Sequence, residues 1–338
     1  IGSGRYKMVQ WDRGQQVIFE ANPDYYGEEP KIKKLTVLFM EEDAALAAAM
    51  AGQADVAHTA ASYSDVPVAG YSLFRVETVD NRGFNLPAVE PVEKDGITYG
   101  NVLTCDVRVR RAINLAIDRQ EMIDNVLNGY GTVAYSICDK MPWYNEEAVT
   151  EYDLDAAKAL MDEAGWTEGK DGIREKDGQK LEIRWLTYPS RQELPLLAES
   201  AQATLKEIGM DVQVNCTSDN NTIRKDPTLW DVYASAMVTA PTGDPEYFFT
   251  SCTLDESASN NGHYHSDKLE DLEKQMKQEF DADKRSDLAI QMQQTILDDN
   301  AYVFCSHLRM SMIMQSNVTG LTAHPCDYYE LTADLDIN

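Results

Sequence analysis

The first twenty residues constrain the fold most, because they have the composition of β-structure from the very start of the chain. Gly2 and Gly4 mark a turn, and the segments 5–11 and 15–20 have the alternating, β-branched and aromatic composition of strands. The connection Asp12-Arg13-Gly14 is short and polar, as in a tight turn between antiparallel strands. The pattern predicts a β-hairpin, and it places residue 1 inside a folded unit.

Strands and helices alternate along the rest of the chain. An apolar strand at 35–40 leads into an alanine-rich helix at 41–51 and a second strand at 54–57. A helix at 193–208 follows a strand at 181–186 in the same way. Strand, helix and strand in succession are typical of an α/β fold.

The segment 106–127 has apolar residues at helical spacing and is predicted to form one core helix. Asp106 suits its N-cap, and Gly129 suits the position just after its end. Arg108, Arg110 and Arg111 lie in the first turn, where a positive charge opposes the helix dipole. These arginines therefore need carboxylate or ligand partners.

Composition excludes several classes of function. The 338 residues are enough for about two domains, and 57 Asp and Glu against 30 Lys and Arg give a net charge of -27. Such a chain repels nucleic acid, which is not expected as a partner. The six cysteines are scattered without a Cys-x-x-Cys spacing, which favours core thiols with at most one disulfide over a zinc site. No nucleophile elbow, P-loop or His-Glu-x-x-His motif occurs, and no cofactor is predicted.

Three segments carry a resemblance to a known family. They are the opening hairpin with Asn22-Pro23-Asp24-Tyr25-Tyr26, the stretch MAGQADVA at 50–57, and DVRVRRAINLAIDR at 106–119. In the same order they are similar to segments of the extracytoplasmic solute-binding proteins of peptide and nickel ABC importers. The resemblance implies a periplasmic binding protein fold of type II, with two lobes joined by a hinge and mixed sheets flanked by helices.

The resemblance also implies an organisation of the chain. Residues 1–80 are expected to form part of the first lobe, residues 81–305 the second lobe, and residues 306–338 a return to the first. The polar stretch 79–86 is interpreted as the crossing between lobes. In the family, the opening hairpin lies in mid-chain. A large N-terminal part is therefore expected to be lacking, and that fragment is expected as a further partner.

The function implied is capture of a small ligand, a peptide or a nickel chelate, in an interlobe cleft and delivery to ABC permease subunits. The location implied is extracytoplasmic, either periplasmic or as a membrane-anchored lipoprotein. No catalysis is expected. An extracellular hydrolase and a sensory binding module on the same fold remain as alternatives.

The segment 238–250, VTAPTGDPEYFFT, is the strongest candidate for ligand contact. Its prolines and glycine predict a rigid irregular loop, and its candidate ligand-binding residues are Thr239, Thr242, Asp244 and Tyr247. Phe248 and Phe249 could equally anchor a surface loop to the core. The pair Asp244-Pro245 matches the ligand-facing segment of the family, whereas the aspartate that peptide-binding relatives place upstream is replaced here. This difference favours a metal chelate.

Six further candidates come from position in the chain. Tyr188 and Arg191 follow a strand end and precede a helix, where α/β folds gather ligand groups. Trp143 and Tyr144 follow a proline in a loop, and Arg82 and Asn85 lie in the predicted crossing. An ordinary structural role is an alternative for each. His263 and His265 could ligate a metal, but a turn leading into a capped helix is favoured, and no metal ligand is predicted.

Overall fold

The computed structural model describes residues 2–94, 96–138, 140–323, 329–330 and 332–338. The chain divides into two compact units. Unit 1 contains Ile1–Thr78 and Arg309–Asn338, and unit 2 contains Val79–Leu308. Each unit has its own clusters of packed side chains, so each is described by itself.

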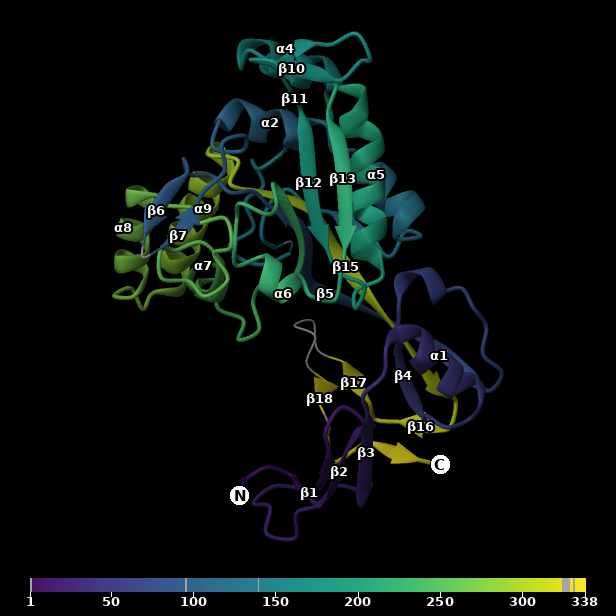
Figure 1. Cartoon of the computed structure of the whole chain (residues 1–338). Coiled ribbons are helices and arrows are strands. Elements are labelled where there is room, and N and C mark those ends of the chain that lie inside the picture. The colour runs from purple at the N-terminus through teal and green to yellow at the C-terminus, as the bar shows by residue number, and fades with distance from the viewer. Residues whose placement is uncertain (1, 95, 139, 324–328, 331) are drawn as a thin grey trace. The chain divides into compact units, whose positions relative to one another are not determined.

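Unit 1 begins with a three-stranded antiparallel sheet (Figure 1) of β1 (Tyr6–Asp12), β2 (Gln16–Ala21) and β3 (Lys34–Leu38). The predicted hairpin is confirmed, with Tyr6 paired to Ala21 at one end and Asp12 to Gln16 at the other. Gly14 in the connecting turn has a φ of 73°, a conformation that glycine adopts without strain. The register shifts between Met8 and Gln10, so β1 carries a bulge.

The second part of unit 1 is the predicted strand-helix-strand region. Helix α1 (Glu42–Met50) packs Leu46 and Ala49 against Ala57 of β4 (Val56–Thr59) and against Ile313. A 3-10 turn η1 (Ala61–Tyr63) follows. The C-terminal residues add the short pairs β16 (Val318–Thr319) with β19 (Asp336–Ile337) and β17 (Thr322–Ala323) with β18 (Tyr329–Glu330).

The chain passes between the units within two long strands, β5 (Tyr71–Asn85) and β15 (Tyr302–Gln315). They are neighbours in a mixed sheet of order β13-β12-β14-β5-β15-β4, in which β8 (Gly131–Val133) also pairs with β15. The polar stretch 79–86 is therefore not a break in regular structure. It continues β5, and residues Val79 to Asn85 are all buried.

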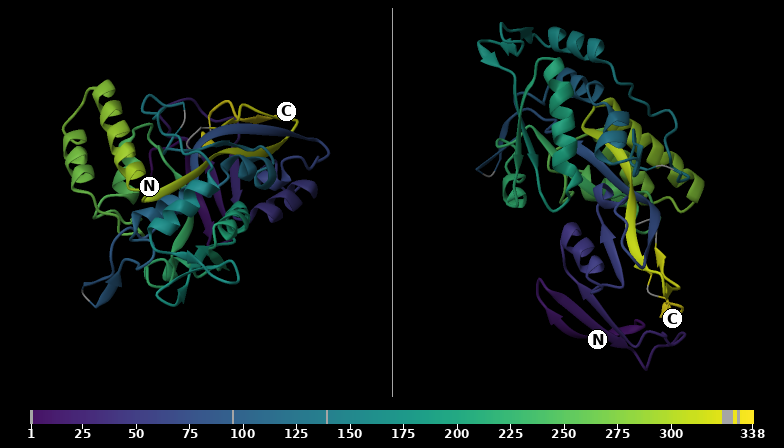
Figure 2. Two further views of the ribbon diagram at one scale, coloured as in Figure 1. Left: turned by 90° about the horizontal axis from the view of Figure 1, so that it is seen from above. Right: turned by 90° about the vertical axis from the view of Figure 1, so that its right-hand side faces the viewer.

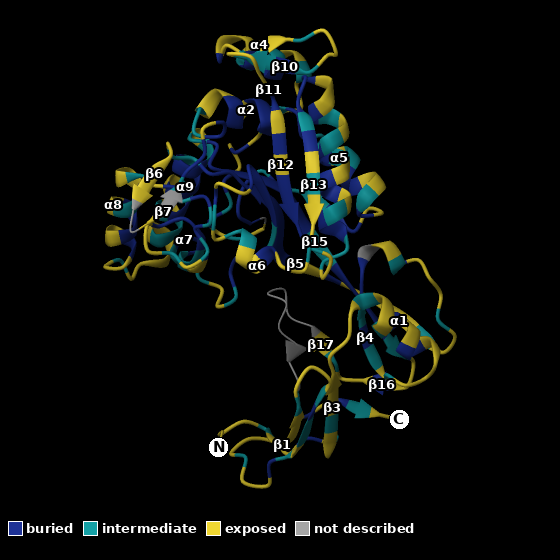
Figure 3. Ribbon diagram, in the orientation of Figure 1, coloured by how far each residue is buried: buried dark blue, intermediate teal, exposed yellow. Residues whose placement is uncertain are grey.

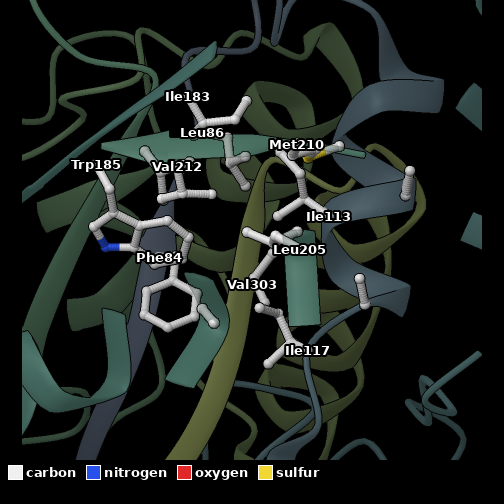
Figure 4. Close-up of a cluster of buried hydrophobic side chains, with 14 of the residues drawn as sticks. Phe84, Leu86, Ile113, Ile117, Ile183, Trp185, Leu205, Met210, Val212 and Val303 are labelled. Atoms are coloured by element: carbon white, nitrogen blue, oxygen red, sulfur yellow. The ribbon is translucent and has the colours of Figure 1, made fainter. Parts of the chain in front are cut away.

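The core of unit 2 lies between this sheet and its helices. The strands are β12 (Glu182–Thr187), β13 (Asp211–Cys216) and β14 (Val232–Val238), and helices α2 (Val107–Leu115) and α5 (Glu193–Glu207) contribute to the same cluster. Figure 4 shows Phe84 of β5 next to Trp185 of β12, with ring centroids 4.6 Å apart in an edge-on arrangement. β12 is parallel to both β13 and β14, whereas β14 is antiparallel to β5, which confirms a mixed α/β fold.

The prediction of one helix over 106–127 is wrong in its length. The segment forms α2, then α3 (Arg119–Glu121), then a π-helical turn η2 (Met122–Val126). Asp106 caps α2 as predicted, but Asp118 caps a second helix start by accepting a hydrogen bond from the backbone N–H of Glu121. The segment 106–127 has apolar residues at helical spacing throughout, but the second capping side chain, Asp118, divides it into two helices.

Two of the three arginines of this region, Arg108 and Arg110, have partners within the protein. Arg108 pairs with Asp106 at 2.6 Å, and the buried Arg110 donates to the carbonyls of Thr104, Cys105 and Asp299. Burial lowers the pKa of Arg110, and the nearby charge of Asp299 opposes this effect.

The remaining elements of unit 2 surround the core. The short strands are β6 (Val92–Lys94), β7 (Ile97–Tyr99), β9 (Thr167–Glu168), β10 (Arg174–Lys176) and β11 (Gln179–Lys180). The other helices are α4 (Leu154–Glu163), α6 (Asn220–Ile223), α7 (Glu246–Cys252), α8 (Asp267–Met276) and α9 (Ala282–Asp298). Helices α8 and α9 lie side by side in both views of Figure 2. Among the described residues, no helix combines the length and apolar character needed to cross a bilayer.

Four of the cysteines that the structure describes, Cys105, Cys216, Cys252 and Cys305, are free thiols, and Cys252 and Cys305 are buried. The sixth cysteine, Cys326, lies outside the described residues, so a disulfide that includes it is not tested.

Candidate functional site

A buried group of charges lies in unit 2 where β5 meets the start of α5. The guanidinium of Arg82 is 2.7 Å from a carboxylate oxygen of Asp80 and 2.5 Å from one of Glu193. Arg82 is 1% exposed, and both carboxylates are almost fully buried. The guanidinium thus lies between two carboxyl groups in the interior of unit 2.

The pKa values follow from this geometry. Burial alone would lower the pKa of Arg82, but the charges of Asp80 and Glu193 outweigh it and raise the pKa. Burial alone would raise the pKa of Glu193, and the charge of Arg82 holds it below its ordinary value. The shifts of Arg82 and Glu193 both favour the charged forms, and Arg82 is occupied by internal partners.

Tyr188 and Arg191 lie beside this charge cluster, after the end of β12. The ring of Tyr188 lies 6.2 Å from that of Tyr233, and burial raises the pKa of its hydroxyl. Arg191 is half-buried, and its guanidinium makes no hydrogen bond or ion pair to the described residues, although its backbone carbonyl accepts a hydrogen bond from Leu194. Its charge nevertheless acts on both neighbours: it opposes the burial that raises the pKa of Tyr188, and it adds to the effect of Arg82 in lowering the pKa of Glu193. The charge cluster, Tyr188 and Arg191 thus share one neighbourhood.

The segment 238–250 starts at the same place, because Val238 of β14 pairs with Asp80 of β5. The side chain of Thr239 is buried and donates a 2.6 Å hydrogen bond to the carbonyl of Val79. Thr242 is exposed, and Tyr247 is 40% exposed. The start of the loop is therefore fixed by a hydrogen bond at Thr239, whereas Thr242 in its middle is exposed to solvent.

Asp244 is held by an arginine of α9. The guanidinium of Arg285 donates to both carboxylate oxygens of Asp244, at 2.8 and 3.0 Å, and also to Glu246 at 3.1 Å. Asp244 in turn accepts a hydrogen bond from the backbone N–H of Glu246, at the start of α7. In this structure the carboxylate of Asp244 thus fixes the loop to two helices.

The second half of this segment is helical and not irregular as predicted. It forms α7, which buries Phe248 and Phe249 completely. The ring of Phe248 packs edge-on against that of Tyr302 at 6.0 Å. The two phenylalanines anchor the loop to the core, which was the alternative interpretation of their role.

The other candidates lie in separate surroundings. The amide of Asn85 donates to the hydroxyl of Ser235 at 3.0 Å, and Ser235 lies 3.0 Å from the hydroxyl of Tyr302. Trp143 is buried, and its carbonyl accepts a hydrogen bond from Gln293 of α9 at 2.8 Å, whereas Tyr144 is half-buried. No described contact joins Trp143 to the charge cluster.

Pockets of about 500 Å³ and about 360 Å³ also lie in unit 2, but none of the ten candidate residues lines either. In the larger pocket Lys180 pairs with Asp171, and Arg184 pairs with Asp231 at 2.8 Å. Two of the three cations that line the larger pocket are thus paired with carboxylates, and the third, Lys176, donates to the carbonyl of Ala164 at 2.8 Å.

The histidines have different partners. The ring of His263 packs against Tyr99 at 4.3 Å, and burial lowers its pKa, whereas His265 binds Asp255 at 2.8 Å. Among the residues with described positions, no group of three or more His, Cys, Asp or Glu side chains could hold a metal ion.

Comparison with known proteins places the chain in a family. The sequence profile described as bacterial extracellular solute-binding proteins, family 5 Middle, matches residues 1–260. The chain belongs to this family. The family match confirms the resemblance drawn from the three sequence segments.

Curated members of family 5 resemble most of this chain. Protein XP55 of Streptomyces lividans is 29% identical over 95% of the chain, and the oligopeptide-binding protein AppA of Bacillus subtilis (strain 168) is 28% identical over 96%. The nickel-binding protein NikA of Staphylococcus aureus is 25% identical over 86%. The chain spans 58%, 60% and 56% of the lengths of these relatives.

Solved structures of family 5 proteins share the fold. NikA from Staphylococcus aureus in complex with Ni(L-His)2 gives a TM-score of 0.85 at 20% identity, over 100% of this chain and 69% of that one. AppA from Bacillus subtilis in complex with a nonapeptide gives 0.84 at 24% identity, over 100% of this chain and 67% of that one. These matches confirm a fold of the periplasmic binding protein type.

Two members of the charge cluster, Asp80 and Glu193, were not among the predicted site residues. Asp80 could have been found, because residues two apart in a strand share one face and Asp80-x-Arg82 sits in β5. Glu193 could not, because it is 111 residues from Arg82 and nothing local signals the contact.

Proposed function

We propose that this family 5 chain is the solute-binding component of an ABC importer, located outside the cytoplasm. The observation that carries the proposal is the family match over residues 1–260. Curated relatives and solved structures include binding proteins for oligopeptides and for nickel. The chain binds a short peptide or a nickel chelate and carries out no chemistry of its own.

In this proposal the two units are the lobes, with residues 1–80 and 306–338 in the first lobe and 81–305 in the second. Closure of the lobes around the ligand presents the closed form to the permease subunits. A lipid anchor would keep the protein at the membrane, and a further N-terminal part of the family fold would complete the first lobe.

The candidate residues take two different roles. Arg82, Thr239 and Asp244 have internal partners, which favours a role in fixing the wall of the site. Arg191, Thr242 and Tyr247 have exposed surface and are the groups proposed to touch ligand. Arg191 is suited to a carboxylate, which histidine chelates and peptides both carry.

Calorimetric titration with Ni²⁺-histidine and with defined peptide pools tests the proposal. Binding of one of the two ligand classes is expected, and silence with every member of both would contradict it. Replacing Arg191→Gln is expected to weaken binding about tenfold, through loss of one charge-assisted contact. Arg111→Gln, an exposed arginine of the same unit, is the matched control and should leave the affinity unchanged.

A further inference from the structure

Helix α7 begins without a capping side chain of its own. Its N-cap residue is Pro245, which makes no side-chain hydrogen bond to the helix, and the helix is only 7 residues long. A helix of this length is not stable by itself in water, so contacts with the rest of unit 2 must hold it. Phe248 and Phe249 supply apolar contacts. At the start of the helix the contacts are polar, and they come from Arg285 of α9.

The guanidinium of Arg285 is fully used by protein acceptors. A guanidinium carries five N–H groups on three nitrogen atoms. Nε and one terminal nitrogen donate to the carboxylate of Asp244 at 3.2 and 2.8 Å, and the same terminal nitrogen donates to Glu246 at 3.1 Å. The other terminal nitrogen donates to the backbone carbonyls of Met276 at 2.6 Å and Glu279 at 3.1 Å. Every nitrogen of this side chain, which is 17% exposed, thus has an acceptor within the protein.

Arg285 therefore joins three segments of unit 2. Asp244 lies in the turn before α7, Glu246 in the first turn of α7, and Met276 and Glu279 at the end of α8 and just after it. Helices α7, α8 and α9 lie together in unit 2, and each carries both buried and exposed residues (Figure 3). A lysine could not make the same set of contacts, because its ammonium is a single point without a planar fork.

Two of the residues proposed to touch ligand are neighbours of the residues that this guanidinium holds. Thr242 precedes Asp244 by two positions, Tyr247 directly follows Glu246, and both Thr242 and Tyr247 are exposed. The backbone that carries them is therefore fixed by one side chain. A binding segment that is already ordered loses less conformational entropy when a ligand arrives, and it binds more tightly for that reason.

We propose that Arg285 is a positioning residue, which touches no ligand itself and raises the affinity of the site by holding residues 242–247 through Asp244 and Glu246. This role rests on the proposed function, because the residues held are those proposed to contact ligand. It assigns part of the affinity to a side chain that lies outside the contact surface.

Hydrogen exchange of the ligand-free chain, residues 1–338, measures whether the segment is held. Arg285→Gln is expected to speed the exchange of the backbone amides of α7 several-fold and to leave β5 protected as before, because the helix start alone opens locally. Asp244→Asn, at a side chain that is 42% exposed, is expected to have the same effect, and it decides the matter if Arg285→Gln fails to fold. Lys284→Gln is the matched control, since it removes the adjacent cation of α9, which is 68% exposed, and should change nothing.

A double-mutant cycle on ligand affinity separates positioning from a general loss of packing. Calorimetry with Ni²⁺-histidine, and with each peptide that binds, gives the dissociation constants of the unsubstituted chain, the two single variants and the double variant. We expect each single substitution to weaken binding about fivefold. The double variant should bind no more weakly than Arg285→Gln alone, because both substitutions remove the same contact. The control Lys284→Gln should bind like the unsubstituted chain.

Three results would overturn the positioning role. They are unchanged exchange of α7 in Arg285→Gln, unchanged affinity of Arg285→Gln, and effects of the two substitutions that multiply in the double variant. If neither probe binds the unsubstituted chain, the proposed ligand classes are refuted, and the exchange of α7 alone decides whether Arg285 holds the segment. Normal binding together with unchanged exchange refutes the positioning role and leaves the proposed function intact.

Discussion

The guanidinium of Arg82 lies between two carboxylates in the interior of unit 2, and this arrangement makes each partner important for stability. A buried charge that loses its counter-charge is costly, whereas the intact pair contributes little compared with an apolar substitute. Arg82 therefore matters to the wall of the proposed site through the residues it holds, Asp80 of β5 and Glu193 of α5.

Glu193→Gln is expected to lower the free energy of unfolding by about 2 kcal/mol at pH 7, because Arg82 would keep only Asp80 as a partner. The pKa of Glu193 is lower in the folded state than in the unfolded state. Its contribution to the free energy of unfolding is therefore present above the unfolded pKa of about 4.3, and it is lost as the pH falls through the pKa of the folded state. Urea unfolding at several pH values measures this. Glu199→Gln, exposed on the same helix, is the control, and an equal loss in both variants would contradict the prediction.

Glu273 of α8 is expected to behave in the opposite sense. It is 2% exposed, and burial raises its pKa despite Lys277 at 3.0 Å. A raised folded pKa means that stability is lost as the pH rises through that value. Glu273→Gln should therefore raise the free energy of unfolding by about 1 kcal/mol at pH 8 and have a smaller effect at pH 4.

Thermal unfolding at the two pH values measures this difference. Asp271→Asn on the same helix removes a solvent-exposed carboxylate that pairs with Lys274, and surface pairs of this kind contribute little. A destabilised Glu273→Gln variant at pH 8 would show that the Lys277 pair outweighs the cost of burial.

Among the elements, β5 depends on one glycine. A Cβ atom on Gly83 would lie 2.3 Å from a ring carbon of Tyr302 and 2.6 Å from the carbonyl oxygen of Val303. Gly83→Ala is expected to cost about 3 kcal/mol, because the strands β5 and β15 could no longer approach as closely. Denaturant unfolding followed by circular dichroism measures the change. Gly4→Ala, where the nearest atom is 3.9 Å away, should be nearly neutral.

The elements also show what the sequence could predict. The hairpin, the helix at 41–51 and the helix at 193–208 follow from local periodicity and turn residues, and they are present as β1–β2, α1 and α5. The stretch 79–86 was interpreted as a crossing between lobes, and the boundary between the two units falls at Val79. Its burial within β5 was not predicted, because Arg82 and Asn85 find partners in Glu193 and Ser235, which lie more than 100 residues away.

The candidate site was predictable to the same degree. Tyr188 and Arg191 lie between the end of β12 and the start of α5, as the sequence predicts. The prolines and the glycine of residues 241–245 likewise indicate the turn that precedes α7. The pairing of Asp244 with Arg285 depends on how α9 packs, 41 residues further along, and could not be derived from residues 238–250 alone. The ligand-binding roles themselves remain predictions.

At the scale of the whole molecule, unit 2 has a core of its own. The main cluster of buried apolar side chains runs from Phe84 to Cys305, entirely within unit 2. Residues 79–308, expressed alone, are therefore expected to fold cooperatively, since their ends lie on neighbouring strands of one sheet. A single sigmoidal denaturation curve and dispersed amide resonances would support this.

The control is a fragment of residues 92–308, which lacks β5 together with Phe84 and Leu86. It is expected to remain unfolded because the sheet loses the strand between β14 and β15. If the shorter fragment folds as well, β5 is not part of the cooperative core.

The pairing of β4 with β15 also bears on how the protein is made. Thr59 pairs with Ser311, which leaves the ribosome 252 residues later. At synthesis rates of about 5–20 residues per second, strand β4 waits roughly 13 to 50 s for its partner. During that interval the helix α1 and the strand β4 have no Ile313 to pack on. The region of α1 and β4 is thus expected to need protection, as a chaperone gives, until the residues of β15 have been made.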